Sequence, residues 1–174
     1  MSDTLITIVA ILLAAILMFL FPLLAVSEQS DNIAQLSVQS STTEFVDNAR
    51  SIGKITMDDY TTLVTSTAAT GNSYDIEMEI KVLDENIGKK SAWTQGTVIG
   101  ENVYYSIYTS QIVEVLQDKG VYTMKEGDIF SASVKNTNQT MSQTIRSVFY
   151  SISGSDIYSI AAHHTGVVTA NGAY

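Results

Sequence analysis

The sequence contains no cysteine, which excludes disulfides and thiolate metal sites throughout its 174 residues. It contains one proline, Pro22, so proline-rich linkers and polyproline recognition segments are absent as well. Positive charge is scarce, because 9 Lys and Arg residues face 18 Asp and Glu residues and the formal net charge is −9. Nucleic acid and anionic lipid headgroups attract clusters of Lys and Arg, so nucleic acid is not an expected partner.

The sequence does have one long apolar run, residues 5–26, which begins at Leu5, ends at Val26 and holds no charged residue. As a helix the run is roughly 33 Å long, enough to cross a hydrocarbon core of roughly 30 Å. The sequence therefore predicts a transmembrane anchor at residues 1–27, with the lipid bilayer as its partner. A buried core helix and a signal peptide cleaved after Ser27 are the alternatives. They are less favoured, because the run lacks a polar face and no positive charge precedes it.

The orientation of this anchor has little support in the sequence. No Lys or Arg precedes the run, and the first one after it is Arg50, so the positive-inside rule has almost nothing to count. We expect the larger C-terminal part to be extracytoplasmic, since the short segment before Leu5 is the easier end to leave inside. The predicted location is the cell membrane, crossed once.

Residues 28–72 are predicted to form a helical stalk, continuous with the anchor, and a second helix. The apolar stripe of the stalk consists of Ala34, Val38, Phe45, Ala49 and Ile52. Pro22 is expected to bend the long helix, and a break within the Ser- and Thr-rich residues 40–43 is left open. Gly53 is expected to end this helix, and Thr56 to begin the next one through a capping box with Asp59.

Residues 73–174 are predicted to form a small α+β globular head. Strict alternation over residues 74–82 predicts a strand with one face on a core and one in water. Further strands are expected at 121–124, 128–134 and 157–168, with helices at 111–119 and after Thr140, and the tail from Ala170 is expected to fray. Residues 103–108 are either a short strand or part of a loop. This order is that of the ferredoxin-like (βαββαβ) arrangement, an antiparallel sheet with helices on one face.

The helix after Thr140 is predicted in more detail. Gln143 completes a second capping box, which uses Thr140 as a cap and makes the glycosylation sequon at Asn138 a chance match. The helix is expected to turn an apolar stripe toward the core. This stripe consists of Met141, Ile145, Val148 and Phe149.

Residues that could carry out chemistry are few. His163 and His164 are adjacent on an expected strand and so point to opposite faces, which does not suit one metal ion. Asp58 and Asp59 suit a helix N-terminus better than a catalytic carboxylate pair. Residues 84–86, Asp-Glu-Asn, lack the ligand spacing of a calcium loop. We expect no enzymatic activity, no cofactor and no small-molecule substrate.

Three tyrosines are candidates for contacts with a partner: Tyr104, Tyr105 and Tyr108. Tyrosine combines a large contact area with a polar tip, so exposed clusters of tyrosine often mark contacts between proteins. The competing interpretation is that these residues are ordinary sheet and core tyrosines.

Four segments of the sequence carry a resemblance to a known family. They are residues 45–56 (Phe-Val-Asp-Asn-Ala-Arg-Ser-Ile-Gly-Lys-Ile-Thr), Tyr60 with residues 70–77, residues 122–128, and Gly166 with the two valines after it. Following an N-terminal membrane helix, they resemble small pilin-like proteins of tight-adherence (Tad) systems, especially the TadE-like ones of Gram-positive bacteria. One feature departs from prepilin-peptidase substrates, which carry a Glu early in the apolar run: the first acidic residue after Leu5 is Glu28.

This resemblance implies a non-catalytic, membrane-anchored pilin-like subunit, or a minor or accessory component, of a surface fibre or secretion apparatus related to type IV pili. Its partners would be other pilin-like subunits or assembly-platform proteins. The alternative function is a membrane-anchored extracytoplasmic binding or sensor domain, or an accessory domain of a mobile element. A sensor normally carries a sizeable cytoplasmic output region, for which we expect no room before Leu5.

Overall fold

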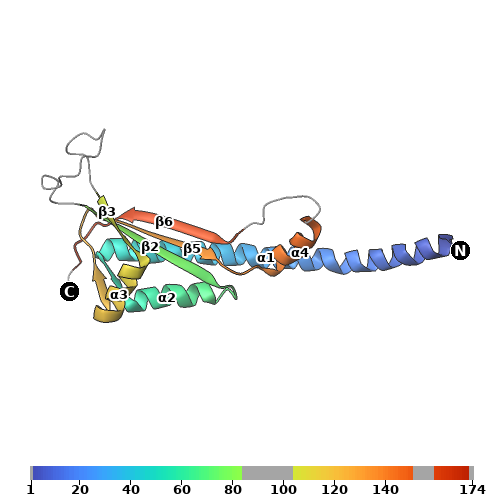
Figure 1. Ribbon diagram of the computed structural model, residues 1–174, viewed down its shortest axis with the longest axis horizontal. Coiled ribbons are helices and arrows are strands. Elements are labelled where there is room, and N and C mark those ends of the chain that lie inside the picture. Colours follow the sequence, from blue (N-terminus) through green and yellow to red (C-terminus); the bar gives the residue numbers. More distant parts are fainter. Residues whose placement is uncertain (1, 84–103, 151–158, 173–174) are drawn as a thin grey trace, which may run out of the picture.

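The computed structural model describes residues 2–83, 104–150 and 159–172, and it is dominated by one long helix, α1 (Ser2–Ile52). This helix of 51 residues is roughly 77 Å long at the usual helical rise. Its first half projects away from the rest of the chain, and its second half lies along a sheet (Figure 1). The helix is continuous through residues 40–43, so the break left open by the sequence does not occur.

The elements after α1 form a small α+β head. In chain order they are β1 (Lys54–Thr56), α2 (Met57–Ala68), β2 (Tyr74–Leu83), β3 (Tyr104–Tyr108), α3 (Thr109–Lys119), β4 (Val121–Thr123), β5 (Ile129–Asn136), α4 (Met141–Tyr150) and β6 (Ala161–Val167). The predicted class, a long N-terminal helix joined to an α+β head with an antiparallel sheet, is confirmed. The uncertain segment around residues 103–108 is a strand.

The main sheet has four antiparallel strands in the order β3-β2-β5-β6. One cross-strand row runs from Met78 in β2 through Ala132 in β5 to His164 in β6, and these residues face α1. The neighbouring rows face away from α1 and carry most of the polar side chains. We call this second surface the open face of the sheet.

The ferredoxin-like strand order is not confirmed. In that order β4 would join the main sheet beside β5, and β6 would pair with β2. In the described residues, β4 instead pairs with β1 in a separate two-stranded sheet, β6 pairs with β5, and β3 pairs with β2. The reason is local: β1 has three residues, with Ile55 buried between two half-buried neighbours, and so short a segment does not predict which strand it pairs with.

The core lies between α1 and the main sheet. Phe45 of α1 contacts Phe130 of β5 edge to face, with ring centroids 5.6 Å apart. Of the predicted stripe on α1, Ala34, Val38, Phe45 and Ala49 are buried, but Ile52 is 45% exposed. The buried stripe turns gradually around the helix to include Thr42 and Val46, so the last turn presents Ile52 to solvent.

The C-terminal segment closes over the end of α1. Gly53 adopts φ 75°, as expected for a helix stop, and its carbonyl accepts a hydrogen bond of 2.7 Å from Met124 N. Gly172 N donates to Met124 O at 3.0 Å, and Thr169 N donates to Arg50 O at 3.0 Å. The expected fraying from Ala170 is therefore wrong through residue 172, because these backbone groups are hydrogen-bonded.

Candidate functional site

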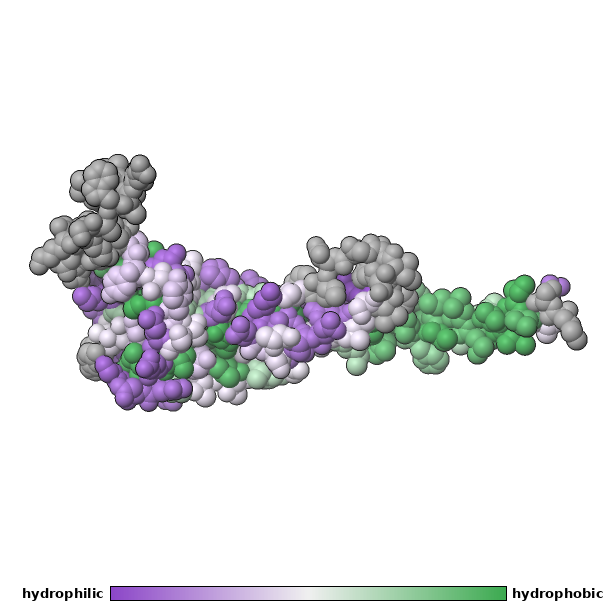
Figure 2. All heavy atoms as spheres, viewed as in Figure 1, coloured by the Kyte–Doolittle hydropathy of each residue, from purple (hydrophilic) through white to green (hydrophobic). Residues whose placement is uncertain are grey.

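The first half of α1 is an apolar helix that nothing in the described chain covers. Figure 2 shows it as an apolar projection beyond the more polar head. Thirteen large apolar side chains of residues 5–26 are exposed, and Met18 and Phe19 reach 76% and 78%. Within the described residues, α1 is the helix long and apolar enough to cross a membrane, and the most apolar stretch of it has no buried residue.

The helix α4 lies against α1 just where the apolar run ends (Figure 1). Arg146 of α4 donates two hydrogen bonds to Oε1 of Glu28, at 3.0 Å from Nε and 2.5 Å from the terminal nitrogen. Asp31, one turn further along α1, accepts hydrogen bonds from the hydroxyls of Thr140 and Ser142. These polar contacts fix the head to α1 beside the last residues of the apolar run.

The N-terminus of α4 has the predicted capping box. Thr140 N donates to Gln143 Oε1 at 3.0 Å, and Gln143 N donates to Thr140 Oγ1 at 3.3 Å. The glycosylation motif is thus used structurally, and Asn138 accepts a hydrogen bond of 2.8 Å from Ser73 N.

The predicted orientation of α4 is wrong at Met141. That side chain is 63% exposed, whereas the polar residues Ser142 and Gln143 are buried. The physical reason is that α4 faces two carboxylates, Glu28 and Asp31, and binds them with its polar side. Ile145 is half-buried, and the side chains of Val148 and Phe149 lie outside the described part of the chain.

The three candidate tyrosines lie on β3, an edge strand, and they do not form one surface. Tyr105 pairs with Val82 and shares the side of the sheet that faces the core, and it is 48% exposed. Tyr104 and Tyr108 alternate with it and belong to the open face, where Tyr108 is 59% exposed opposite Glu79. The proposed contact is therefore divided between the two faces of one strand.

The open face carries a shallow hollow of about 700 Å³. Its floor includes a cross-strand row of Glu77, Ser133 and His163, and the next row pairs Ser131 with Glu79. Glu79 accepts a hydrogen bond of 2.7 Å from Ser106. In the parts of the chain that the structure describes, no group of three or more His, Asp or Glu residues is arranged to hold a metal ion.

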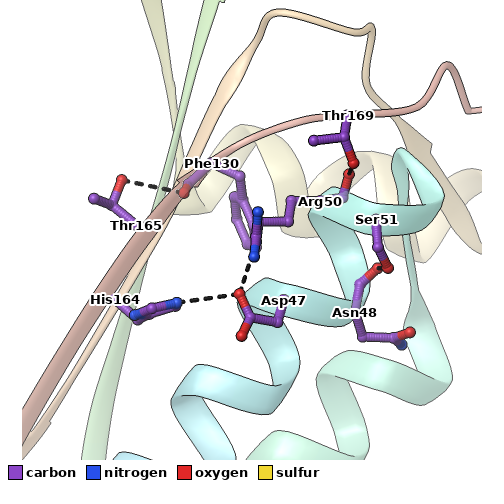
Figure 3. A network of polar contacts seen from close by, with 8 residues as sticks. All are labelled: Asp47, Asn48, Arg50, Ser51, Phe130, His164, Thr165 and Thr169. Atoms are coloured by element: carbon purple, nitrogen blue, oxygen red, sulfur yellow. Dashed lines mark hydrogen bonds and ion pairs between the residues drawn. The ribbon is translucent and has the colours of Figure 1, made fainter.

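The two histidines point to opposite faces, as predicted. His163 is exposed on the open face, whereas His164 Nε2 lies 3.2 Å from Asp47 Oδ1 of α1 (Figure 3). The same carboxylate oxygen accepts a hydrogen bond of 2.7 Å from Arg50 Nε. The Arg50 and His164 hydrogen bonds, in that order of importance, lower the pKa of Asp47 from its ordinary value of 3.8. This network fastens β6 to α1.

The remaining candidate residues from the sequence, Asp58, Asp59 and residues 84–86, either belong to the start of a helix or lie outside the described part of the chain. Asp59 completes the capping box of α2, since Thr56 N donates to its Oδ2 at 3.0 Å and Asp59 N donates to Thr56 Oγ1 at 3.1 Å. Asp58 is an exposed acid in the first turn of the same helix. Residues 84–86 lie outside the described part of the chain.

Sequence reasoning did not single out Glu28, Asp31 and Arg146 as a group. Glu28 and Arg146 are 118 residues apart in the chain, and each belongs to a segment whose sequence pattern is that of an ordinary solvent-facing helix. One signal was available: Arg146 is the sole charged residue in the sequence of α4, and a lone cation on a short helix needs an anionic partner.

Comparison of the chain with protein-family models, with curated proteins and with solved structures finds no match.

Proposed function

We propose that this protein is a non-catalytic, single-pass, membrane-anchored pilin-like subunit or accessory component of a Tad-type surface fibre or secretion apparatus. The observation that carries the proposal is the division of α1 into two halves with different surroundings. The second half forms the core with the sheet, and the first half is apolar on all sides and bare.

The bare half of α1 needs a nonaqueous partner on energetic grounds. Thirteen large apolar side chains are exposed there. At a burial free energy of ~1.5 kcal/mol each, they are together equivalent to about 20 kcal/mol, more than the total stability of a typical domain. A bilayer, or the apolar helices of neighbouring copies, would supply the missing contacts.

One feature of α1 favours an assembling subunit over a lone anchor. The exposed apolar surface continues beyond the run, since Ile33 and Leu36 of the stalk are 61% and 67% exposed. These positions lie roughly 10 Å and 15 Å past Val26 along the helix axis, beyond the lipid core, where neighbouring helices can cover them.

A membrane-anchored binding or sensor domain is the second candidate. The hollow on the open face favours it, because Glu77, Glu79 and His163 offer polar groups to a ligand. The proposed extracytoplasmic side of the head is the same for both functions, so location alone does not separate them.

The test is the intact mass of the native protein in the membrane fraction and in the fraction sheared from the cell surface. We expect full-length or minimally trimmed protein in sheared fibres. Full-length protein confined to the membrane would leave a permanent anchor with an accessory or binding role. A mass that corresponds to a chain beginning at Glu28 would mean that a signal peptide is cleaved, and it would overturn the proposal.

A further inference from the structure

The helix α4 is amphipathic in sequence but is packed with its polar side inward. Ser142 and Gln143 are 5% and 6% exposed, and Arg146 turns toward Glu28 of α1. Met141, on another side of the helix, is 63% exposed, and Ile145 follows it at the helical spacing of four. Ile145 is half-buried, but a head surrounded by water on all sides would be expected to bury Met141 as well and to expose Ser142 and Gln143.

The place of α4 along α1 explains this arrangement. Its two attachment points, Glu28 and Asp31, lie roughly 3 Å and 7.5 Å beyond Val26, measured along the helix axis. The headgroup layer on each side of a bilayer is roughly 5 to 7 Å thick. When residues 5–26 fill the hydrocarbon core, α4 is therefore held at the depth of the headgroups.

We infer that α4 is an interfacial element, which holds Met141 and Ile145 within the headgroup layer of the membrane. The partner is the lipid surface itself. This inference builds on the proposed membrane anchoring and adds that the head, as well as α1, touches the bilayer.

The charge around α4 suits this location. The helix contains no acidic residue, although the whole chain has a net charge of −9. The two acids that α4 contacts in the described residues, Glu28 and Asp31, are engaged by Arg146 and by the hydroxyls of Thr140 and Ser142. Amphipathic helices that bind membranes turn their apolar side toward the boundary between headgroups and acyl chains. Met141 lies between Thr140 and Ser142, which bond to Asp31, so the start of α4 is held in the outer part of the headgroup layer.

The absence of cysteine allows a direct test with single-cysteine variants of the full chain. Nitroxide labels are placed at Met141→Cys, at Leu13→Cys within the apolar run, and at Val64→Cys on α2 as a control on an exposed helix face. Each protein is reconstituted in phosphatidylcholine vesicles at two protein-to-lipid ratios. Electron paramagnetic resonance then measures the collision of each label with oxygen, which concentrates in lipid, and with a water-soluble nickel chelate.

We expect nickel accessibility at residue 141 to be several-fold lower than at residue 64, and oxygen accessibility to be higher, at both ratios. A label at 141 as open to nickel as the label at 64, with residue 13 shielded, would overturn the inference and leave the anchor intact. Labels at 13 and 141 that are both open to nickel would overturn the anchoring and the inference together.

A second copy of the protein is the competing occupant of this surface. In that case the label at 141 would lose nickel accessibility without gaining oxygen accessibility, and the shielding would weaken as the protein is diluted with lipid. That result would overturn the lipid contact in favour of a contact between subunits.

Discussion

His164 Nε2 lies 3.2 Å from Asp47 Oδ1, and this contact joins the edge strand β6 to α1 across 117 residues of sequence. Arg50 binds the same oxygen from one turn further along α1 (Figure 3). The carboxylate of Asp47 thus bonds to the end of α1 and to the edge of the sheet at once. Protonation of this carboxylate would weaken the attachment of β6 to α1.

We predict that Asp47 makes the fold sensitive to acid. Its pKa in the folded state is lowered from 3.8, chiefly by the hydrogen bond from Arg50 and then by that from His164. The stabilisation is therefore present above pH 3.8 and is lost as the pH falls through the lowered pKa. Thermal unfolding of Asp47→Asn should show a lower melting temperature at neutral pH and a weaker decline on acidification.

Glu44→Gln is the matched control for this prediction, because Glu44 is an exposed acid on the same helix. Its unfolding curve against pH should follow that of the unmodified protein. If the two variants decline alike in acid, Asp47 has no special part in the pH dependence.

The contact between Phe45 and Phe130 gives a prediction for the core. Phe130 is fully buried, so Phe130→Ala should destabilise the protein by about 3 to 5 kcal/mol through lost contacts and a cavity. Ile52→Ala, at a position that is 45% exposed, should cost less than about 0.5 kcal/mol. Denaturant unfolding measures both as shifts of the midpoint, and comparable shifts would contradict the assigned packing of α1 on the sheet.

Two glycines with the same backbone conformation separate backbone strain from steric overlap. Gly53 and Gly71 have φ values of 75° and 82°, where any L-residue is strained by ~1 to 2 kcal/mol. A Cβ at Gly71 would meet no atom within 4 Å, whereas a Cβ at Gly53 would overlap the backbone at Ala170 and Gly172.

Gly71→Ala should therefore lower the free energy of unfolding by the cost of the backbone strain alone. Gly53→Ala should add the displacement of the C-terminal segment and exceed about 4 kcal/mol, which places it among the most damaging single substitutions. Denaturant midpoints of the two variants measure the difference. Equal losses of stability in the two variants would show that residues 170–172 move aside without a cost in free energy.

The tyrosines of β3 give a prediction about assembly. Tyr104→Ser combined with Tyr105→Ser should reduce the recovery of assembled material in the sheared fraction, with the melting temperature of the head nearly unchanged. Because the two side chains face opposite sides of the sheet, the single variants then show which side is the contact. Normal assembly by the double variant would exclude β3 as a partner surface.

Features set by neighbouring residues could be predicted from the sequence. The alternation of β2, the Gly53 stop of α1 at φ 75° and the Thr56–Asp59 capping box all depend on positions within a few residues of one another. The apolar run is likewise a property of one continuous segment. For such features the spacing of residues along the chain is itself the physical cause of the local structure.

Features set by distant residues could not be predicted in the same way. The pairing of β1 with β4 depends on two three-residue strands that have no pattern of their own. The inverted packing of α4 depends on Glu28 and Asp31, which lie more than a hundred residues earlier in the chain. A stripe on α4 predicts that one side is apolar, but only the position of the carboxylates decides which side turns inward.

The attachment of α4 can be tested at Asp31. Asp31→Ala removes the acceptor used by the hydroxyls of Thr140 and Ser142, both of which are buried. The two hydroxyls can still bond to each other at 3.3 Å, so one of them loses its acceptor, and an unsatisfied buried polar group costs about 1 to 3 kcal/mol. The local opening of α4 should therefore become roughly 5- to 150-fold more frequent. Amide hydrogen exchange measures this opening at the α4 residues up to Ser147, with the amides of the central strand β5 as an internal reference that should not change.

Asp58→Ala is the control variant. It removes an exposed acid from the first turn of α2 and should leave exchange in α4 unaltered. Unchanged exchange in Asp31→Ala would mean that the link between Arg146 and Glu28 alone holds α4, whereas faster exchange throughout β5 would mean that Asp31 supports the whole head rather than its junction with α1.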